Sequence, residues 1–152
     1  MSAGFRLGVV LRLRERAEDA ARAKLAMAVV KHREATDALV MLVALEHDAE
    51  LRLVALGTEG AMAGDLRAAR AGAERAEAAS EAGRATLQAV SEALMQARTV
   101  LADATRRREV VERLRERMRA AEAREAQHRE DNVLSEIAGV RHARTMTSEG
   151  EP

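Results

Sequence analysis

The chain has 152 residues, with 25 basic and 25 acidic side chains, so its formal net charge is zero. This balance argues against a general nucleic-acid-binding protein, which usually has a basic surplus, and the absence of cysteine excludes disulfides and thiolate chemistry. Aromatic residues make up 1% of the chain and its single proline is the last residue, which disfavours a compact globular core and favours long helices.

The first predicted element is a helix over residues 5–56. Its opening stretch "FRLGVVLRLRER" also fits the alternation of a strand, but no partner strand follows that could satisfy the backbone of a strand. Eleven of fifteen positions at alternating spacings of three and four residues are apolar, as in a coiled coil. This seam comprises Leu7, Leu11, Arg14, Glu18, Ala21, Leu25, Ala28, His32, Ala35, Leu39, Leu42, Glu46, Ala49, Leu53 and Leu56.

Residues 57–83 are predicted to form the tip between two helices. Gly57, Gly60 and Gly64 are the densest glycine cluster of the chain and are expected to end the first helix. Gly72 and Gly83 offer alternative turn points, so the position of the turn within the region stays open.

The second predicted helix covers residues 84–140. Its apolar seam is interrupted at the step from Val111 to Leu114, where local overwinding is expected. The seam comprises Leu87, Val90, Leu94, Ala97, Leu101, Ala104, Val111, Leu114, Met118 and Ala121, and Leu134 and Ile137 close the segment.

Together these elements predict an all-α protein, an elongated antiparallel two-helix coiled-coil hairpin that forms a single domain over residues 1–141. Residues 142–152, "HARTMTSEGEP", are predicted to be a disordered tail. A parallel dimer of extended helices is the alternative, and the glycine-rich break makes it less favourable.

Charge is distributed unevenly along the chain. Residues 1–17 have a net charge of +3, residues 106–119 carry seven arginines against three glutamates, and residues 57–104 have a net charge of −2. A hairpin would bring the two basic segments to one end. Each arginine alone is typical of a solvated helix face, but the two clusters together favour docking of an acidic protein partner. RNA is the second candidate, although the chain lacks aromatic side chains on which bases could stack.

The longest apolar run is "ALVMLVAL", residues 38–45, which is far below the roughly 20 residues needed to span a bilayer. Val40, Met41 and Val43 lie off the predicted seam. Either the core is broader here, or these three side chains form an exposed patch that binds a partner.

The sequence offers little for chemistry. Glu125, His128 and Asp131 are spaced by three residues, but a metal site usually needs three or four convergent ligands, so a solvated helix surface is the preferred interpretation. No nucleophile elbow, phosphate-binding loop or dinucleotide-binding turn occurs. We therefore expect no enzyme activity, no metal and no cofactor.

Both ends of the chain resemble the family of the flagellar export protein FliJ. The opening pattern Phe5-x-Leu7-x-x-Val10-Leu11-x-x-Arg14 precedes the segment "ERAEDAARAKLAMA". The Arg/Glu-rich stretch that starts "RREVVERLRERMRA" ends in Leu134-x-Glu136-Ile137-Ala138-x-x-Arg141. Ser135, where the family often has an acid, and the glycine-rich middle depart from the family pattern.

The resemblance implies an antiparallel coiled coil, similar to the central stalk of rotary ATPases, in the cytoplasmic part of the flagellar type III export apparatus. It implies that one end binds the hexameric export ATPase, and that other surfaces contact the cytoplasmic domain of the membrane-embedded export gate and the export chaperones. The protein would then be cytoplasmic and peripheral at the inner membrane.

On the same basis, Phe5, Leu7, Val10, Leu11, Leu134 and Ile137 are the expected packing residues, and Val40, Met41 and Val43 are the candidate gate or chaperone patch. The candidate residues for docking to the ATPase are Arg12, Arg14, Arg16, Arg106, Arg107, Arg113 and Arg117. An equivalent stalk of an injectisome or a rotary ATPase, and a purely structural dimerising coil, are the alternatives.

Overall fold

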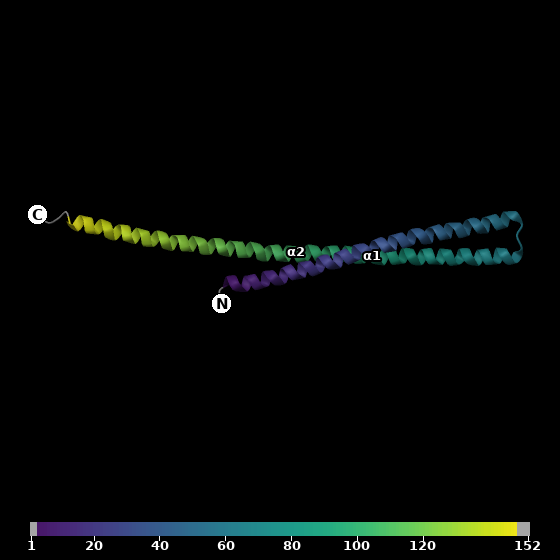
Figure 1. Ribbon diagram of the computed structural model, residues 1–152, viewed down its shortest axis with the longest axis horizontal. Helices are drawn as coiled ribbons and strands as arrows, with labels where there is room; N and C mark the ends of the chain where they lie inside the picture. Colours follow the sequence, from purple (N-terminus) through teal and green to yellow (C-terminus); the bar gives the residue numbers. More distant parts are fainter. Residues whose placement is uncertain (1–2, 149–152) are drawn as a thin grey trace. The chain divides into compact units, whose positions relative to one another are not determined.

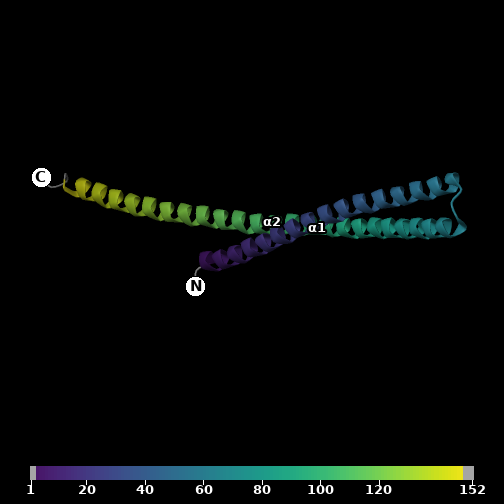
Figure 2. The same cartoon turned by 45° about the vertical axis from the view of Figure 1, so that its right-hand side comes forward.

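The computed structural model describes the backbone of residues 3–148 and the side chains of residues 6–141. The described residues form two helices, α1 (Ala3–Glu59) and α2 (Ala63–Ser148), and contain no strand (Figure 1). On either side of the connecting turn the helices run antiparallel and side by side, and Figure 2 gives the same pairing from a second direction. The predicted all-α fold with an antiparallel helix pair is therefore confirmed.

The chain divides into two compact units. The hairpin unit consists of Arg16–Thr105 and includes the turn, and the terminal unit consists of Met1–Glu15 together with Arg106–Pro152. The expectation of a single domain over residues 1–141 stays a prediction.

The turn between the helices has the hydrogen bonding of a Schellman motif. The backbone N–H of Ala61 donates to the carbonyl oxygen of Leu56 at 3.3 Å, and Gly60 adopts a φ of 76°. Glycine is the residue best suited to this left-handed conformation, since it has no Cβ to clash with the backbone. At the start of α2, the backbone N–H of Asp65 donates to the carbonyl oxygen of Met62 at 3.0 Å, and the Asp65 carboxylate lies in the positive first turn of the helix.

The region expected to be the tip, residues 57–83, is mostly helical. α2 already begins at Ala63, 21 residues before the expected start at residue 84. Alanine is the best helix former and fills this segment, so a regular helix forms although the segment has few large apolar side chains. Of the possible turn points, the structure uses Gly60, while Gly72 and Gly83 lie inside α2.

The predicted seam of α1 is found in the hairpin unit. Every seam position from Glu18 to Leu56 is buried or half-buried, and Ala21 is 4% exposed. Its partner on α2 follows the same spacing, with Leu94 8% exposed and Leu87, Val90, Ala97 and Leu101 half-buried. A two-helix core is thin, because each side chain can be covered from one direction only.

At Gly83 of α2 the seam leucines of α1 lie close to the backbone of the partner helix. A Cβ atom built on Gly83 would lie 2.8 Å from Cδ1 of Leu42 and 3.2 Å from Cδ1 of Leu39. The missing side chain of Gly83 therefore makes room for two leucines of the α1 seam.

In the terminal unit the pairing is short. Leu11 is buried and Leu7 is half-buried, but on α2 all side chains of residues 121–141 are exposed. Among the described residues, α1 contacts α2 in this unit as far as the cleft at Leu7 and residues 115–122, whereas α2 continues as a helix to Ser148. At about 1.5 Å per residue, the uncovered stretch of residues 121–141 extends over roughly 30 Å.

The α2 seam in this unit differs from the predicted one. Leu114 is 46% exposed and Ala121 is exposed, whereas Arg108 and Arg115 are half-buried. The regular spacing of three and four residues continues through Arg108, Val111, Arg115 and Met118, so the predicted seam positions at Leu114 and Ala121 are wrong. The predicted interruption at residues 111–114 arose because only apolar residues were counted as seam positions. Arginines can also occupy a seam, since their long methylene chains pack against apolar neighbours.

At its C-terminal end, α2 is helical to Ser148, beyond the expected end at residue 140. The helix therefore includes most of the segment for which disorder was expected, and residues 149–152 lie outside the described residues.

Candidate functional site

The two basic segments lie together in the terminal unit. Leu7 of α1 and Arg115, Met118, Arg119 and Glu122 of α2 line a shared cleft of about 150 Å³, which places the start of α1 against residues 115–122 of α2. The apolar contact therefore holds two arginine-rich stretches side by side, so their net positive charges lie close together. We call this surface, formed by residues 6–15 and 106–119, the basic surface.

The basic surface presents its arginines to solvent. Of the candidate docking residues, Arg12 and Arg14 on α1 and Arg106, Arg107, Arg113 and Arg117 on α2 are exposed. Arg16 is exposed as well, but it belongs to the hairpin unit. The predicted juxtaposition of basic residues from both helices is thus present within the terminal unit for six of the seven arginines.

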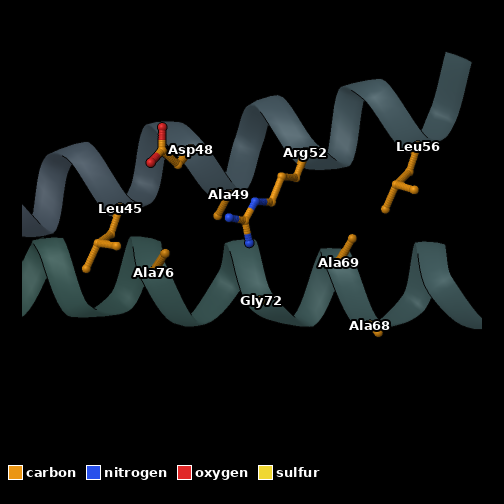
Figure 3. Close-up of a pocket in the computed structure, with 9 residues that line it drawn as sticks. All are labelled: Leu45, Asp48, Ala49, Arg52, Leu56, Ala68, Ala69, Gly72 and Ala76. Carbon is orange, nitrogen blue, oxygen red and sulfur yellow. The ribbon is translucent and has the colours of Figure 1, made fainter.

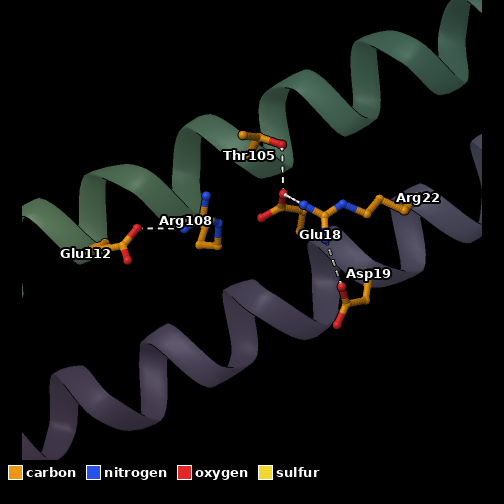
Figure 4. Close-up of polar contacts among 6 residues, drawn as sticks. All are labelled: Glu18, Asp19, Arg22, Thr105, Arg108 and Glu112. Atoms are coloured by element: carbon orange, nitrogen blue, oxygen red, sulfur yellow. Dashed lines mark hydrogen bonds and ion pairs between the residues drawn. The ribbon is translucent and has the colours of Figure 1, made fainter.

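Some arginines of the basic surface are paired within α2. Arg108 donates to the carboxylate of Glu112 at 2.6 Å (Figure 4), and Arg113 donates to Glu109 at 3.4 Å. Within the described part of the chain, Arg12, Arg14, Arg107 and Arg117 form no ion pair. These four guanidinium groups keep all their donors for water or for a partner.

The basic surface does not lie at the end of α2. The exposed residues 121–141 continue the helix past the cleft at Leu7, and they carry five acidic side chains against three arginines. The expectation that the basic segments form the end of a hairpin is therefore wrong for α2. A partner bound at the basic surface would also meet a net negative, uncovered helix beside it.

The expected packing residues divide into two groups. Leu7 and Leu11 pack as expected, and Val10 is 38% exposed. Leu134 and Ile137 are 64% and 47% exposed, so the packing expected of them is not found among the described residues. The side chain of Phe5 lies outside the described residues.

Sequence reasoning missed the arginines that face the partner helix. Arg108 keeps only 26% of its side chain exposed, and Arg115 lines the cleft with Leu7. The signal was available, because continuing the spacing of three and four residues from Leu101 and Ala104 leads to Arg108 and Arg115.

The hairpin unit contains a buried carboxylate that connects the two helices. Glu18 of α1 is 2% exposed and accepts hydrogen bonds from Arg22 at 2.6 Å and from the hydroxyl of Thr105 on α2 at 3.2 Å (Figure 4). A buried charge is tolerated only when its oxygens are bonded in this way. Nearer the turn, Arg84 of α2 pairs with Glu46 of α1 at 3.3 Å. These polar contacts fix the pairing of the helices better than apolar contacts, which allow sliding.

The apolar patch expected on α1 is exposed. Val40, Met41 and Val43 are 65%, 70% and 41% exposed, while Leu39 and Leu42 of the seam are half-buried. The three patch residues therefore face away from α2, as the predicted register requires.

A groove near the turn completes the surface features of the hairpin unit. It has a volume of about 410 Å³, and small side chains on α2 form its floor (Figure 3). Arg52 of α1 reaches toward α2, whereas Asp48 points away from it. The lining residues are Leu45, Asp48, Ala49, Arg52, Leu56, Ala68, Ala69, Gly72 and Ala76. Such a lining suits the packing of an apolar side chain better than acid–base chemistry.

Two further properties bear on the class of site. Across residues 3–148, neither helix has a stretch with the length and hydropathy that spanning a membrane requires. Among the described side chains, those of residues 6–141, no three histidine, aspartate or glutamate groups gather where they could hold a metal ion. The candidate sites described above are therefore surfaces of helices, either rich in arginine or apolar, of the kind that bind other proteins.

Comparison with known proteins gives one match. The family model described as flagellar FliJ protein matches residues 2–147 of the chain. Among curated proteins no similar chain is found, and no solved structure is similar. The matched range spans both basic segments, the turn and the exposed part of α2.

Proposed function

Because the chain belongs to the flagellar FliJ family, we propose that it binds the hexameric export ATPase through the basic surface and acts as a central-stalk-like coiled coil. Membership of this family makes the protein a component of the flagellar export apparatus, with a role in flagellum biogenesis and protein export. The family is a structural part of this machinery and is not known as an enzyme.

One observation carries the proposal: arginines from the beginning of α1 and from residues 106–119 of α2 lie on paired segments of one unit and are exposed. The net charges of the two parts of the basic surface, +2 for residues 6–15 and +4 for residues 106–119, are partly carried by guanidinium groups without an ion pair in the described residues. Such a surface attracts an acidic partner from a distance and orients it during the encounter.

The proposal extends to further partners and to location. The patch of Val40, Met41 and Val43 lies in the hairpin unit and leaves the basic surface free, so the protein can bind the cytoplasmic domain of the export gate or an export chaperone at the same time. This would place it in the cytoplasm, peripheral to the membrane-embedded export complex at the inner membrane.

The test is charge reversal on the basic surface. We expect the triple variant Arg107→Glu, Arg113→Glu and Arg117→Glu to lose ATPase binding or to bind about 100-fold more weakly, because each reversal replaces attraction by repulsion. Binding of the unchanged protein should weaken between 0.1 M and 1 M salt, since the Debye length falls from about 10 Å to about 3 Å. Titration calorimetry against the purified ATPase measures both effects.

A matched control separates the basic surface from general charge effects. The triple variant Arg67→Glu, Arg75→Glu and Arg98→Glu changes the net charge equally, and these three residues are exposed on α2 in the hairpin unit. It should bind the ATPase as the unchanged protein does. Equal affinity of both triple variants would contradict docking through the basic surface, provided that circular dichroism shows both to be helical.

A further inference from the structure

The hairpin unit has a second groove, which lies between residues 24–31 of α1 and residues 89–93 of α2 and has a volume of about 410 Å³. Ala28 and Val90 belong to the seam and are half-buried, whereas the other lining residues are exposed. The lining residues are Lys24, Met27, Ala28, Lys31, Ala89, Val90 and Ala93. We call this feature the lysine groove. Along it, the thin core between the two helices is not fully covered.

The lysine groove has an apolar interior. On the α2 side, the side chains of Ala89 and Ala93 end at Cβ, so they leave the seam residue Val90 open from this side. On the α1 side, Met27 is 62% exposed, and a flexible methionine adapts its shape to an apolar neighbour. The groove can therefore take up an apolar side chain from outside the hairpin unit.

Two ammonium groups stand beside this apolar interior. Lys24 and Lys31 are exposed, and among the described residues neither forms an ion pair. On a helix a lysine pairs with side chains three or four residues away, and Glu34 is the only acidic residue at these distances from either lysine. The α2 side contributes no carboxylate, since Glu92 does not line the groove and accepts a hydrogen bond from Gln88 at 3.3 Å. The lysine groove is therefore apolar inside and basic at its edge.

From this arrangement we infer that the lysine groove binds an acidic amphipathic helix of a partner protein, which inserts an apolar side chain and pairs with both lysines. Lys24 and Lys31 are seven residues apart, which corresponds to about 10 Å along α1. On a helix laid alongside, two carboxylates seven residues apart match this separation and share one face. In a strand, side chains on one face are about 7 Å or about 13 Å apart, and neither separation matches the two lysines.

A second copy of this chain does not suit the lysine groove. Among the described residues, acidic side chains seven residues apart occur at Glu74 and Glu81 and at Glu109 and Glu116. The apolar residue on the exposed face between Glu74 and Glu81 is Ala78, whose methyl group does not fill a groove of about 410 Å³. Glu109 and Glu116 lie within the basic surface, whose arginines would repel the lysines of the groove.

A membrane surface is also less suitable, although anionic lipids attract lysines. Amphipathic helices bind a membrane through a broad apolar face. In the lysine groove, by contrast, the half-buried Ala28 and Val90 lie between two helices. A protruding side chain of a partner helix can reach this floor, whereas a layer of lipid headgroups cannot.

The test uses two designed peptides of about 21 residues, or three heptads, with a leucine seam and two glutamates each. In the first peptide the glutamates flank the seam and are seven residues apart, and in its twin they lie on the face opposite the seam. Fluorescence anisotropy with the full-length chain should give at least about tenfold tighter binding of the first peptide. Because the composition is the same, general attraction to the basic surface is equal for both peptides.

Charge variants test the two lysines. Lys24→Glu with Lys31→Glu should weaken binding of the first peptide at least about tenfold, because attraction is replaced by repulsion. The control Arg33→Glu with Arg98→Glu changes the net charge equally at two exposed residues that do not line the groove. This control should bind the first peptide as the unchanged chain does.

A steric variant tests the apolar interior without changing any charge. Ala93→Phe should fill the lysine groove and weaken the first peptide at least about tenfold. The control Ala102→Phe adds the same ring at an exposed alanine of α2 outside the groove and should leave binding unchanged. Both alanines are exposed, so circular dichroism should show the helical signal of the unchanged chain.

Four outcomes would overturn the inference. The first two are equal or absent binding of the two peptides and equal losses in a variant and its control. The third is sedimentation of the chain with phosphatidylglycerol vesicles that is lost in the Lys24→Glu, Lys31→Glu variant, which would identify a membrane as the occupant. The fourth is a dimer that Ala93→Phe dissociates, which would identify a second copy.

The lysine groove goes beyond the proposed ATPase docking, since none of its lining residues belongs to the basic surface. The variant with Arg107, Arg113 and Arg117 reversed should therefore keep the preference for the first peptide over its twin. A failure of ATPase docking is thereby distinguished from a failure of the lysine groove.

Discussion

Two stretches of α2 show how differently the same helix is used. Between Leu87 and Leu101 its apolar seam is buried or half-buried against α1 in the hairpin unit. Between residues 121 and 141 in the terminal unit it is exposed on all sides, although Val133, Ile137 and Val140 again follow spacings of four and three residues. A helical period therefore indicates which face is apolar, but whether that face is covered depends on the length of the partner helix.

The largest expected difference is in the free energy of unfolding when one leucine from each stretch is replaced by alanine. Leu94→Ala should lower the free energy of unfolding by about 3 kcal/mol, because it removes a buried side chain and leaves a cavity. Leu134→Ala should change it by less than about 0.5 kcal/mol, because Leu134 is exposed. Urea unfolding followed by circular dichroism measures both values. A large loss for Leu134→Ala would mean that residues 121–141 are covered in solution, for example by self-association.

The next prediction applies the same comparison to neighbouring residues of α1. Leu42→Ala should cost roughly 2 kcal/mol, since Leu42 is half-buried and faces α2 next to Gly83. Met41→Ser should leave the free energy of unfolding nearly unchanged, because its side chain is 70% exposed.

Flagellar export should be affected by Met41→Ser even though this substitution hardly changes the free energy of unfolding, because Met41 belongs to the patch proposed to bind a partner. Met41→Ser should impair export, measured as swimming of cells that carry the variant, whereas its stability stays near that of the unchanged protein. If Met41→Ser unfolds the chain as readily as Leu42→Ala, Met41 is a core residue and the patch does not exist.

The smallest effect concerns two glycines inside α2. Gly72→Ala should stabilise the protein by up to about 1 kcal/mol, because alanine has the higher helix propensity and a Cβ there meets nothing within 4 Å. Gly83→Ala should give no such gain, since its Cβ would lie 2.8 Å from Leu42 and force that side chain to move. Thermal unfolding resolves the difference, and equal gains would show that α1 and α2 do not approach closely at Gly83.

Much of the hairpin unit could be predicted from the sequence. The seam of α1 follows from its spacing, because leucines and alanines alternate with charged residues strongly enough to mark one face. The same pattern correctly predicts that Val40, Met41 and Val43 face outward. The start of α2 could not be found in this way, because its alanines occupy every face of the helix and leave no contrast between a buried and an exposed side.

The terminal unit was harder to predict for two physical reasons. Arg108 and Arg115 lie in the seam, and a search for apolar residues passes over them although their methylene groups can pack. The exposure of Leu134 and Ile137 depends on where α1 begins relative to α2, which is a property of the pairing and not of the local sequence. The basic surface itself was predictable, because its net charge can be counted along the chain.

The short turn at Gly60 has a consequence for how the hairpin unit forms. Partners across the helices are separated by 38 residues at Glu46 and Arg84 and by 87 residues at Glu18 and Thr105. Closing the longer loop from an open chain is entropically costly, but once the contacts next to the turn exist, each further contact closes only a few additional residues. We therefore expect the contacts between the helices to form in order of their distance from the turn at Gly60, so that the hydrogen bond between Glu18 and Thr105 is among the last to form.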